Sequence, residues 1–108
     1  MSPRRRSPLP LFWSRRAQTD LQEITDFIAQ DDEGAARRWT DRLMEAAERA
    51  ALMPRSGRMV PEFSREEIRE VLLKPYRIVY RVQERRITVL TVFESHRLIE
   101  GPWQAADQ

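Results

Sequence analysis

The stretch IREVLLKPYRIVYRVQERRITVLTVF, residues 68–93, decides the fold. Its last two apolar runs, 77–82 and 87–93, alternate with a period of two, which is typical of β-strands, and the polar turn 83–86 joins them. Residues 68–73 are rich in branched side chains and predict a third strand, which ends before Lys74-Pro75 because proline is tolerated at a strand end. The second half of the chain therefore predicts an antiparallel meander.

Two helices are expected before this meander. Apolar residues recur at helical spacing over 15–30 and again over 34–53, and the second pattern ends at Pro54 because the residue before a proline disfavours the helical region. A short apolar run at 9–13 predicts a first strand or an extended arm. The predicted fold class is α+β, with an N-terminal strand and an antiparallel helix hairpin packed on a small antiparallel sheet.

The length of 108 residues supports one domain. We expect the domain at 9–100, between a flexible arginine-rich tail at 1–8 and a C-terminal tail at 101–108. No apolar run approaches the ~20 residues that span a bilayer, and the start lacks the apolar core of a signal peptide. The sequence thus predicts a cytoplasmic protein without a membrane partner.

The composition excludes several kinds of site. The chain has no cysteine and one histidine, so a disulfide framework, a thiolate zinc site and a histidine-rich metal site are not expected, and no cofactor is implied. Eighteen arginines and one lysine give a pI of about 9.6. Arginine suits phosphate and carboxylate partners, although high-GC codon usage would produce the same bias.

Several short segments together carry a family resemblance. In chain order they are Ala17–Leu21 followed by Ile24 and Ile28, Pro54–Glu62, Ile68–Glu70, Tyr76–Val82, and His96-Arg97. With this order and spacing the chain resembles the RelE/ParE superfamily of toxins from type II toxin–antitoxin systems. The segments GRMVPE and IRE, followed by YRIVYRV, resemble the ParE branch more than the RelE ribonuclease branch.

The resemblance implies a toxin that inhibits bacterial growth by binding and poisoning DNA gyrase, with no active site of its own, and a cognate antitoxin that silences it in a hetero-oligomer. Two alternatives stay open. One is a ribosome-dependent mRNA endoribonuclease of RelE type, and the other is a non-toxic relative that still binds an antitoxin.

A ribonuclease needs a base, an acid and cations over the phosphate. The candidates for these roles are His96, Arg97, Arg77, Arg81 and Tyr76. The chain lacks the complete Glu–His–Tyr ending of the ribonuclease members, and this departure puts the nuclease interpretation in doubt. Tyr80 alternates with Ile78 and Val82, so it is expected in the core rather than in a site.

A gyrase-binding protein needs a surface instead. We expect this surface in an exposed row of polar residues, namely Arg58, Glu62, Arg69, Arg77, Arg81, His96 and Arg97. The same residues would also suit an ordinary solvated sheet face, and the segment from Arg58 to Glu62 would also suit the positioning of an edge strand.

The antitoxin has its own expected contact region. An open antiparallel sheet leaves an edge that an acidic segment can extend as a strand, and a helix can lie in the groove beside the helix hairpin. Leu21, Trp39 and Leu43 are candidates for that groove, and the alternative is that all three belong to the core.

Overall fold

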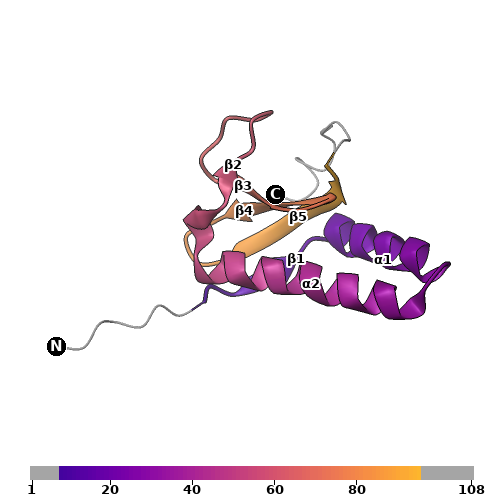
Figure 1. Ribbon diagram of the computed structural model, residues 1–108. Coiled ribbons are helices and arrows are strands. Elements are labelled where there is room, and N and C mark those ends of the chain that lie inside the picture. The colour runs from indigo at the N-terminus through magenta and orange to yellow at the C-terminus, as the bar shows by residue number, and fades with distance from the viewer. Residues whose placement is uncertain (1–7, 96–108) are drawn as a thin grey trace.

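The computed structural model describes residues 8–95. Two long helices lie together against one face of a single sheet (Figure 1). The elements in chain order are β1 (Leu11–Trp13), α1 (Arg15–Ala29), α2 (Glu33–Leu52), a 3-10 turn (Pro54–Ser56), β2 (Arg58–Met59), β3 (Ile68–Leu73), β4 (Tyr76–Val82) and β5 (Ile87–Glu94). The α+β fold class is confirmed, and both helices begin and end within one residue of their expected bounds.

Side-chain caps explain where the helices begin. The Ser14 hydroxyl accepts a hydrogen bond from the Ala17 amide at the start of α1, and the Asp32 carboxylate accepts one from the Ala35 amide at the start of α2. Each cap satisfies an amide that has no partner within the helix, which contributes about 1 kcal/mol. Polar and acidic residues placed just before apolar periodic runs therefore fix the two helix starts.

The sheet has the strand order β1-β5-β4-β3-β2. The expected meander is confirmed as β3, β4 and β5, which pair antiparallel in succession. The expectation of a purely antiparallel sheet needs one correction, because β1 pairs parallel with β5, with Leu11 opposite Ile87. The chain passes from β1 to β5 through the helix hairpin and strands β2, β3 and β4, a long connection of the kind that parallel neighbours require.

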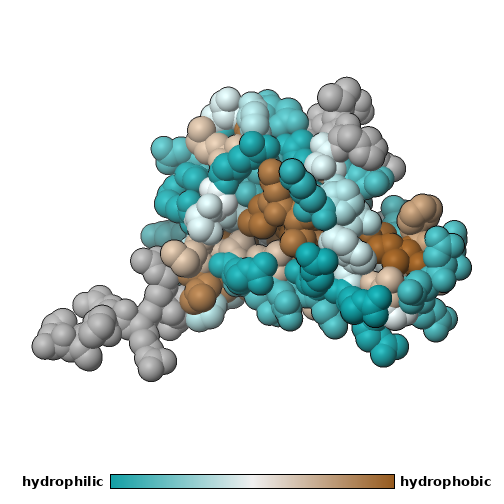
Figure 2. Space-filling view, in the orientation of Figure 1, coloured by the Kyte–Doolittle hydropathy of each residue, from teal (hydrophilic) through white to brown (hydrophobic). Residues whose placement is uncertain are grey.

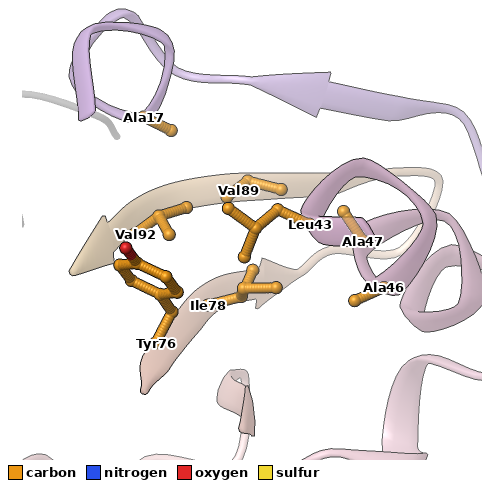
Figure 3. Packing of buried hydrophobic residues seen from close by; sticks show 8 residues of the cluster. All are labelled: Ala17, Leu43, Ala46, Ala47, Tyr76, Ile78, Val89 and Val92. Carbon is orange, nitrogen blue, oxygen red and sulfur yellow. The ribbon is translucent and has the colours of Figure 1, made fainter. Parts of the chain in front are cut away.

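The main core lies between the helices and the sheet (Figure 3). Leu43 of α2 packs against Ile78 of β4 and Val89 of β5, and all three side chains are fully buried. Alanines at 46 and 47 let α2 approach the strands closely. Burial of each large aliphatic side chain contributes roughly 1.5–3 kcal/mol, so this layer is the main source of stability.

The face of the sheet that points away from the helices is called the second face below, and a smaller apolar cluster covers part of it. Val60 and Phe63, in the segment between β2 and β3, pack against Val79 and Leu90. This segment thus lies over the second face.

Candidate binding surface

Arg77 is held on the second face by two carboxylates. Its Nε donates to Glu70 at 2.7 Å, and its Nη1 and Nη2 each donate to one oxygen of Glu62 at 3.1 Å. The guanidinium also lies 5.2 Å from the centre of the Phe93 ring. Since only 7 % of the Arg77 side chain is exposed, almost all of its hydrogen-bonding capacity is used inside the protein.

Glu70 completes an ionic cluster of four residues: Arg58, Glu62, Glu70 and Arg77. Its side chain is fully buried; one carboxylate oxygen accepts from Arg77 and the other from Nε of Arg58 in β2. A buried carboxylate needs such partners because an unpaired charge is expensive away from water. Two arginines and two glutamates leave the cluster formally neutral.

The ionic cluster shifts the pKa values of Glu62 and Arg77. Hydrogen bonds from Arg77 hold the pKa of Glu62 below its ordinary value of 4.5, against an opposing effect of burial. The hydrogen bond to Glu62 in turn raises the pKa of Arg77 above its ordinary value. Both residues are therefore charged near neutral pH.

The expected exposed row is not one continuous exposed surface. Arg77 was expected to be exposed and is buried, because Glu62, Glu70 and the segment between β2 and β3 enclose it. Arg69 also leaves the row, since it alternates with Glu70 along β3 and its guanidinium donates to the backbone carbonyls of Glu66 and Gly57.

The rest of the expected row divides into two groups. Arg58, Glu62 and Arg81 lie at least partly exposed, and β-strand alternation places Arg81 on the second face with Arg77. His96 and Arg97 lie outside the described residues. Glu70, which was not among the expected site residues, joins the two halves of the ionic cluster; its signals in the sequence were its place on the same strand face as Ile68 and its part in the IRE segment of the family resemblance.

The candidates for ribonuclease chemistry do not converge within residues 8–95. Tyr76 points toward the helices, where its ring meets Trp39 edge-on at 5.4 Å between centroids, whereas Arg77 and Arg81 point to the second face. Burial, and secondarily the charge of Glu94, raises the pKa of Tyr76 above its ordinary value. A proton donor and a phosphate-binding arginine on opposite faces cannot act on one phosphate.

The residues expected to meet an antitoxin pack in or against the main core. Leu43 is fully buried, and Leu21 and Trp39 are partly buried against the same cluster. The alternative interpretation, that all three are core residues, therefore fits the structure.

A groove does exist, between α2 and β3, and it has a volume of about 420 Å³. Apolar side chains gather above α2 on this face of the molecule (Figure 2). The groove lining includes Ala46, Ala50, Met53, Val71, Leu72 and, at its rim, Arg49 and Arg58. Its sequence signal is the pair of small residues Ala46 and Ala50, which lie one helical turn apart and leave space beside the strand.

Among the described residues, the edge of β3 is open beside this groove. Strand β2 pairs only with Arg69 and Glu70, and no strand within residues 8–95 pairs with the outer side of β3 beyond them. The ladder between β3 and β4 directs the N–H and C=O groups of Leu72 away from β4 and toward this edge. In the described part of the chain, the sheet therefore has the open edge that was expected.

Comparison with known proteins is consistent with this geometry. The family model described as ParE toxin of type II toxin-antitoxin system, parDE, matches residues 11–99. The chain belongs to the ParE toxin family. It is thus a toxin of the RelE/ParE superfamily from type II toxin–antitoxin systems.

Two curated relatives of this ParE family member support the assignment. Toxin RelE2 of Caulobacter vibrioides is 35% identical over 86 residues, which cover 80% of this chain and 94% of the relative. The putative toxin Y4kP of Sinorhizobium fredii is 37% identical over 87 residues, covering 79% and 86%. One relative thus carries a RelE name although the family model is ParE.

Solved structures support the fold alone, because their sequence identities are low. The chromosomal ParDE system from P. aeruginosa matches with a TM-score of 0.67 at 21% identity, covering 80% of this chain and 95% of that chain. The toxin–antitoxin complex RelBE2 from Mycobacterium tuberculosis matches with a TM-score of 0.61 at 19% identity, covering 82% and 99%.

Two further findings concern residues 8–95. Neither helix in this range is both long and apolar enough to cross a membrane. The described part of the chain also holds no group of three or more acidic, histidine or cysteine residues placed to bind a metal ion.

Proposed function

We propose that this ParE family member inhibits bacterial growth by binding DNA gyrase, so that the gyrase–DNA complex accumulates breaks. The observation that supports a binding role is the separation of Tyr76 from Arg77 and Arg81 on opposite faces of the sheet. Arg77 is also neutralised by two carboxylates, which leaves it poorly suited to stabilise a phosphate in a transition state. A surface that binds another protein needs neither a proton donor beside the arginines nor an arginine that is free to bind phosphate.

A second candidate function is cleavage of mRNA on the ribosome. The observation that favours it is the name of a relative with 35% identity, Toxin RelE2. In that case His96 and Arg97, outside the described residues, would have to supply the acid–base and phosphate-binding groups with Arg81.

We also propose that a cognate antitoxin binds this chain and silences it. Two structures with a similar fold come from a ParDE toxin–antitoxin system and from the toxin–antitoxin complex RelBE2. The apolar groove between α2 and β3, with the open edge at Leu72, is the region of the described surface best suited to an added strand or helix.

One paired experiment tests the target. The purified chain is added to gyrase with supercoiled plasmid, and separately to ribosomes translating a defined message. The proposal expects linear, gyrase-linked plasmid and intact message. Cut message together with unbroken plasmid would reject gyrase poisoning and establish the second candidate.

A further inference from the structure

The two carboxylates that hold Arg77 differ in how firmly they are fixed. Glu70 is part of β3, is fully buried, and is bound by a second arginine, Arg58. Glu62 lies in the segment between β2 and β3, outside any strand, and 36 % of its side chain is exposed. Glu62 is therefore the carboxylate that can leave Arg77 without disrupting the sheet.

The position occupied by Glu62 is built to receive a carboxylate. Nη1 and Nη2 of Arg77 form a fork that donates one hydrogen bond to each carboxylate oxygen, which is the geometry with which arginine recognises a planar anion. The positive charge of Arg58 also acts on this carboxylate. Glu70 anchors the other edge of the Arg77 guanidinium through Nε and Nη2, so the fork stays oriented when its occupant changes.

We infer that the Arg77 fork is an exchangeable carboxylate-binding site, which Glu62 fills in the isolated chain and which an Asp or Glu side chain of a partner protein fills in its place. Glu62 is then an internal stand-in for the partner. Its release removes one contact of the turn, while Val60 and Phe63 continue to pack the turn over the second face.

The inference is independent of the cellular target, because it concerns what Arg77 binds and not what the toxin poisons. Its failure would leave the gyrase proposal untouched, and a ribosomal target would leave the carboxylate site untouched. Its test therefore uses small anions and needs neither gyrase nor an antitoxin.

The test is a rescue experiment on the Glu62→Ala variant. Thermal unfolding is followed while sodium acetate replaces sodium chloride at constant ionic strength and neutral pH. Acetate should stabilise this variant saturably, and at about five times its dissociation constant the midpoint should rise on the order of 4 °C. The wild type, whose fork is filled, and the Glu62→Ala/Arg77→Met double variant, whose fork is removed, should show no saturable rise.

A control variant and a second anion show whether the response is specific to the Arg77 fork and to carboxylates. Glu66→Ala removes an exposed glutamate of the same segment whose one ion-pair distance, to Arg55, is 3.7 Å, and it should behave like the wild type. Inorganic phosphate replaces acetate in a parallel series. A saturable rise with phosphate but not with acetate would overturn the carboxylate assignment in favour of a phosphate-bearing ligand.

A second measurement covers the case in which Glu62→Ala does not fold. The Glu62→Gln variant keeps the shape of the side chain, and acetate binding is then followed through the NMR signal of the Arg77 Nε–H. A saturable change in that signal supports the exchangeable site. The absence of saturable acetate binding in both variants, or an equal response in every variant, would overturn it and leave the cluster with a structural role alone.

Discussion

Tyr76 and Arg77 are neighbours in β4, yet their side chains lie on opposite faces of the sheet. Tyr76 packs under the helices against Trp39, and Arg77 enters the ionic cluster on the second face. Strand alternation makes this separation a fixed property of the backbone. It is the main reason why the described part of this ParE family member suits binding better than phosphate chemistry.

The first prediction concerns Tyr76. Tyr76→Phe removes only the hydroxyl and keeps the ring against Trp39, so growth inhibition should remain close to that of the wild type. If Tyr76 were the proton donor of a catalysed reaction, its hydroxyl would instead raise the reaction rate about 10²–10⁴-fold. Dose–response curves of growth against inducer concentration measure this, and a loss in that range at equal protein level would return Tyr76 to the list of catalytic candidates.

The second prediction concerns the stability of the ionic cluster. Arg77→Met leaves the fully buried Glu70 with Arg58 as its partner, and removing one partner of a buried ion pair costs about 3–5 kcal/mol. Urea unfolding should therefore show a large decrease in the free energy of unfolding of Arg77→Met. The double variant Arg77→Met/Glu70→Leu should recover much of this free energy.

A matched control for this loss is Arg85→Met, in the exposed turn between β4 and β5, which should change the free energy of unfolding by less than about 0.5 kcal/mol. If Arg77→Met lowered the free energy of unfolding as little as Arg85→Met, the ionic cluster would not stabilise the folded protein.

The third prediction concerns the close approach of Gly57 to β3 and β4. A Cβ at this position would lie 2.3 Å from the Tyr80 hydroxyl oxygen and 2.7 Å from the Glu70 carbonyl oxygen. Gly57→Ala should therefore destabilise the protein by about 1–3 kcal/mol, as overpacking typically does. It should also disturb the hydrogen bonds from the Gly57 amide to the Tyr80 hydroxyl and from that hydroxyl to the Pro54 carbonyl.

Gly34 provides the comparison for Gly57, because it is an exposed glycine in the first turn of α2 and a Cβ there would meet side-chain atoms at 3.3 Å. Gly34→Ala should be neutral or stabilising by up to about 1 kcal/mol, since alanine favours the helix. Equal effects of the two substitutions on denaturant unfolding would contradict the packing described around Gly57.

The fourth prediction concerns pH. The pKa of Glu62 is lowered in the folded protein, chiefly by its hydrogen bonds with Arg77, so its stabilising effect is present above the ordinary value of 4.5 and is lost as the pH falls through the lower, folded value. The wild type should therefore exceed Glu62→Gln in stability at pH 7, and the difference should shrink below about pH 4.5.

The Glu62→Gln comparison is needed because Glu67 also has a lowered pKa, owing to its own backbone amide and to Arg65, and it contributes equally to both proteins. Urea unfolding from pH 7 to pH 3 measures the difference. A stability difference that does not change with pH would show that the charge of Glu62 does not stabilise the folded state.

The alternation of residues 68–93 is a strong local signal, and it predicted the three central strands and the inward orientation of Tyr80. The same alternation placed Arg77 on the second face correctly. It could not show that this face is covered, because the cover comes from Val60 and Phe63, which lie in a segment with no periodic pattern. Exposure of a strand face depends on distant parts of the chain, and local spacing does not contain that information.

The partner of β1 is a second feature that local sequence does not determine. Three residues, Leu11–Trp13, can pair with either open edge of a meander, and only the packing of the helix hairpin selects β5. The ionic cluster is likewise only partly predictable from local sequence. Arg58, Glu62 and Arg77 were recognised as polar residues of one region, whereas Glu70, which joins them, looked like an ordinary strand residue.

The most direct test of the proposed function is a comparison in living bacteria. The chain is induced in cells whose gyrase-linked DNA breaks and message integrity are measured from the same cultures, alongside the His96→Ala and Arg97→Ala variants. The account predicts that breaks accumulate within the period of growth arrest while messages stay intact, and that neither variant changes message integrity. Message cleavage that requires His96 or Arg97, without gyrase-linked breaks, would contradict it.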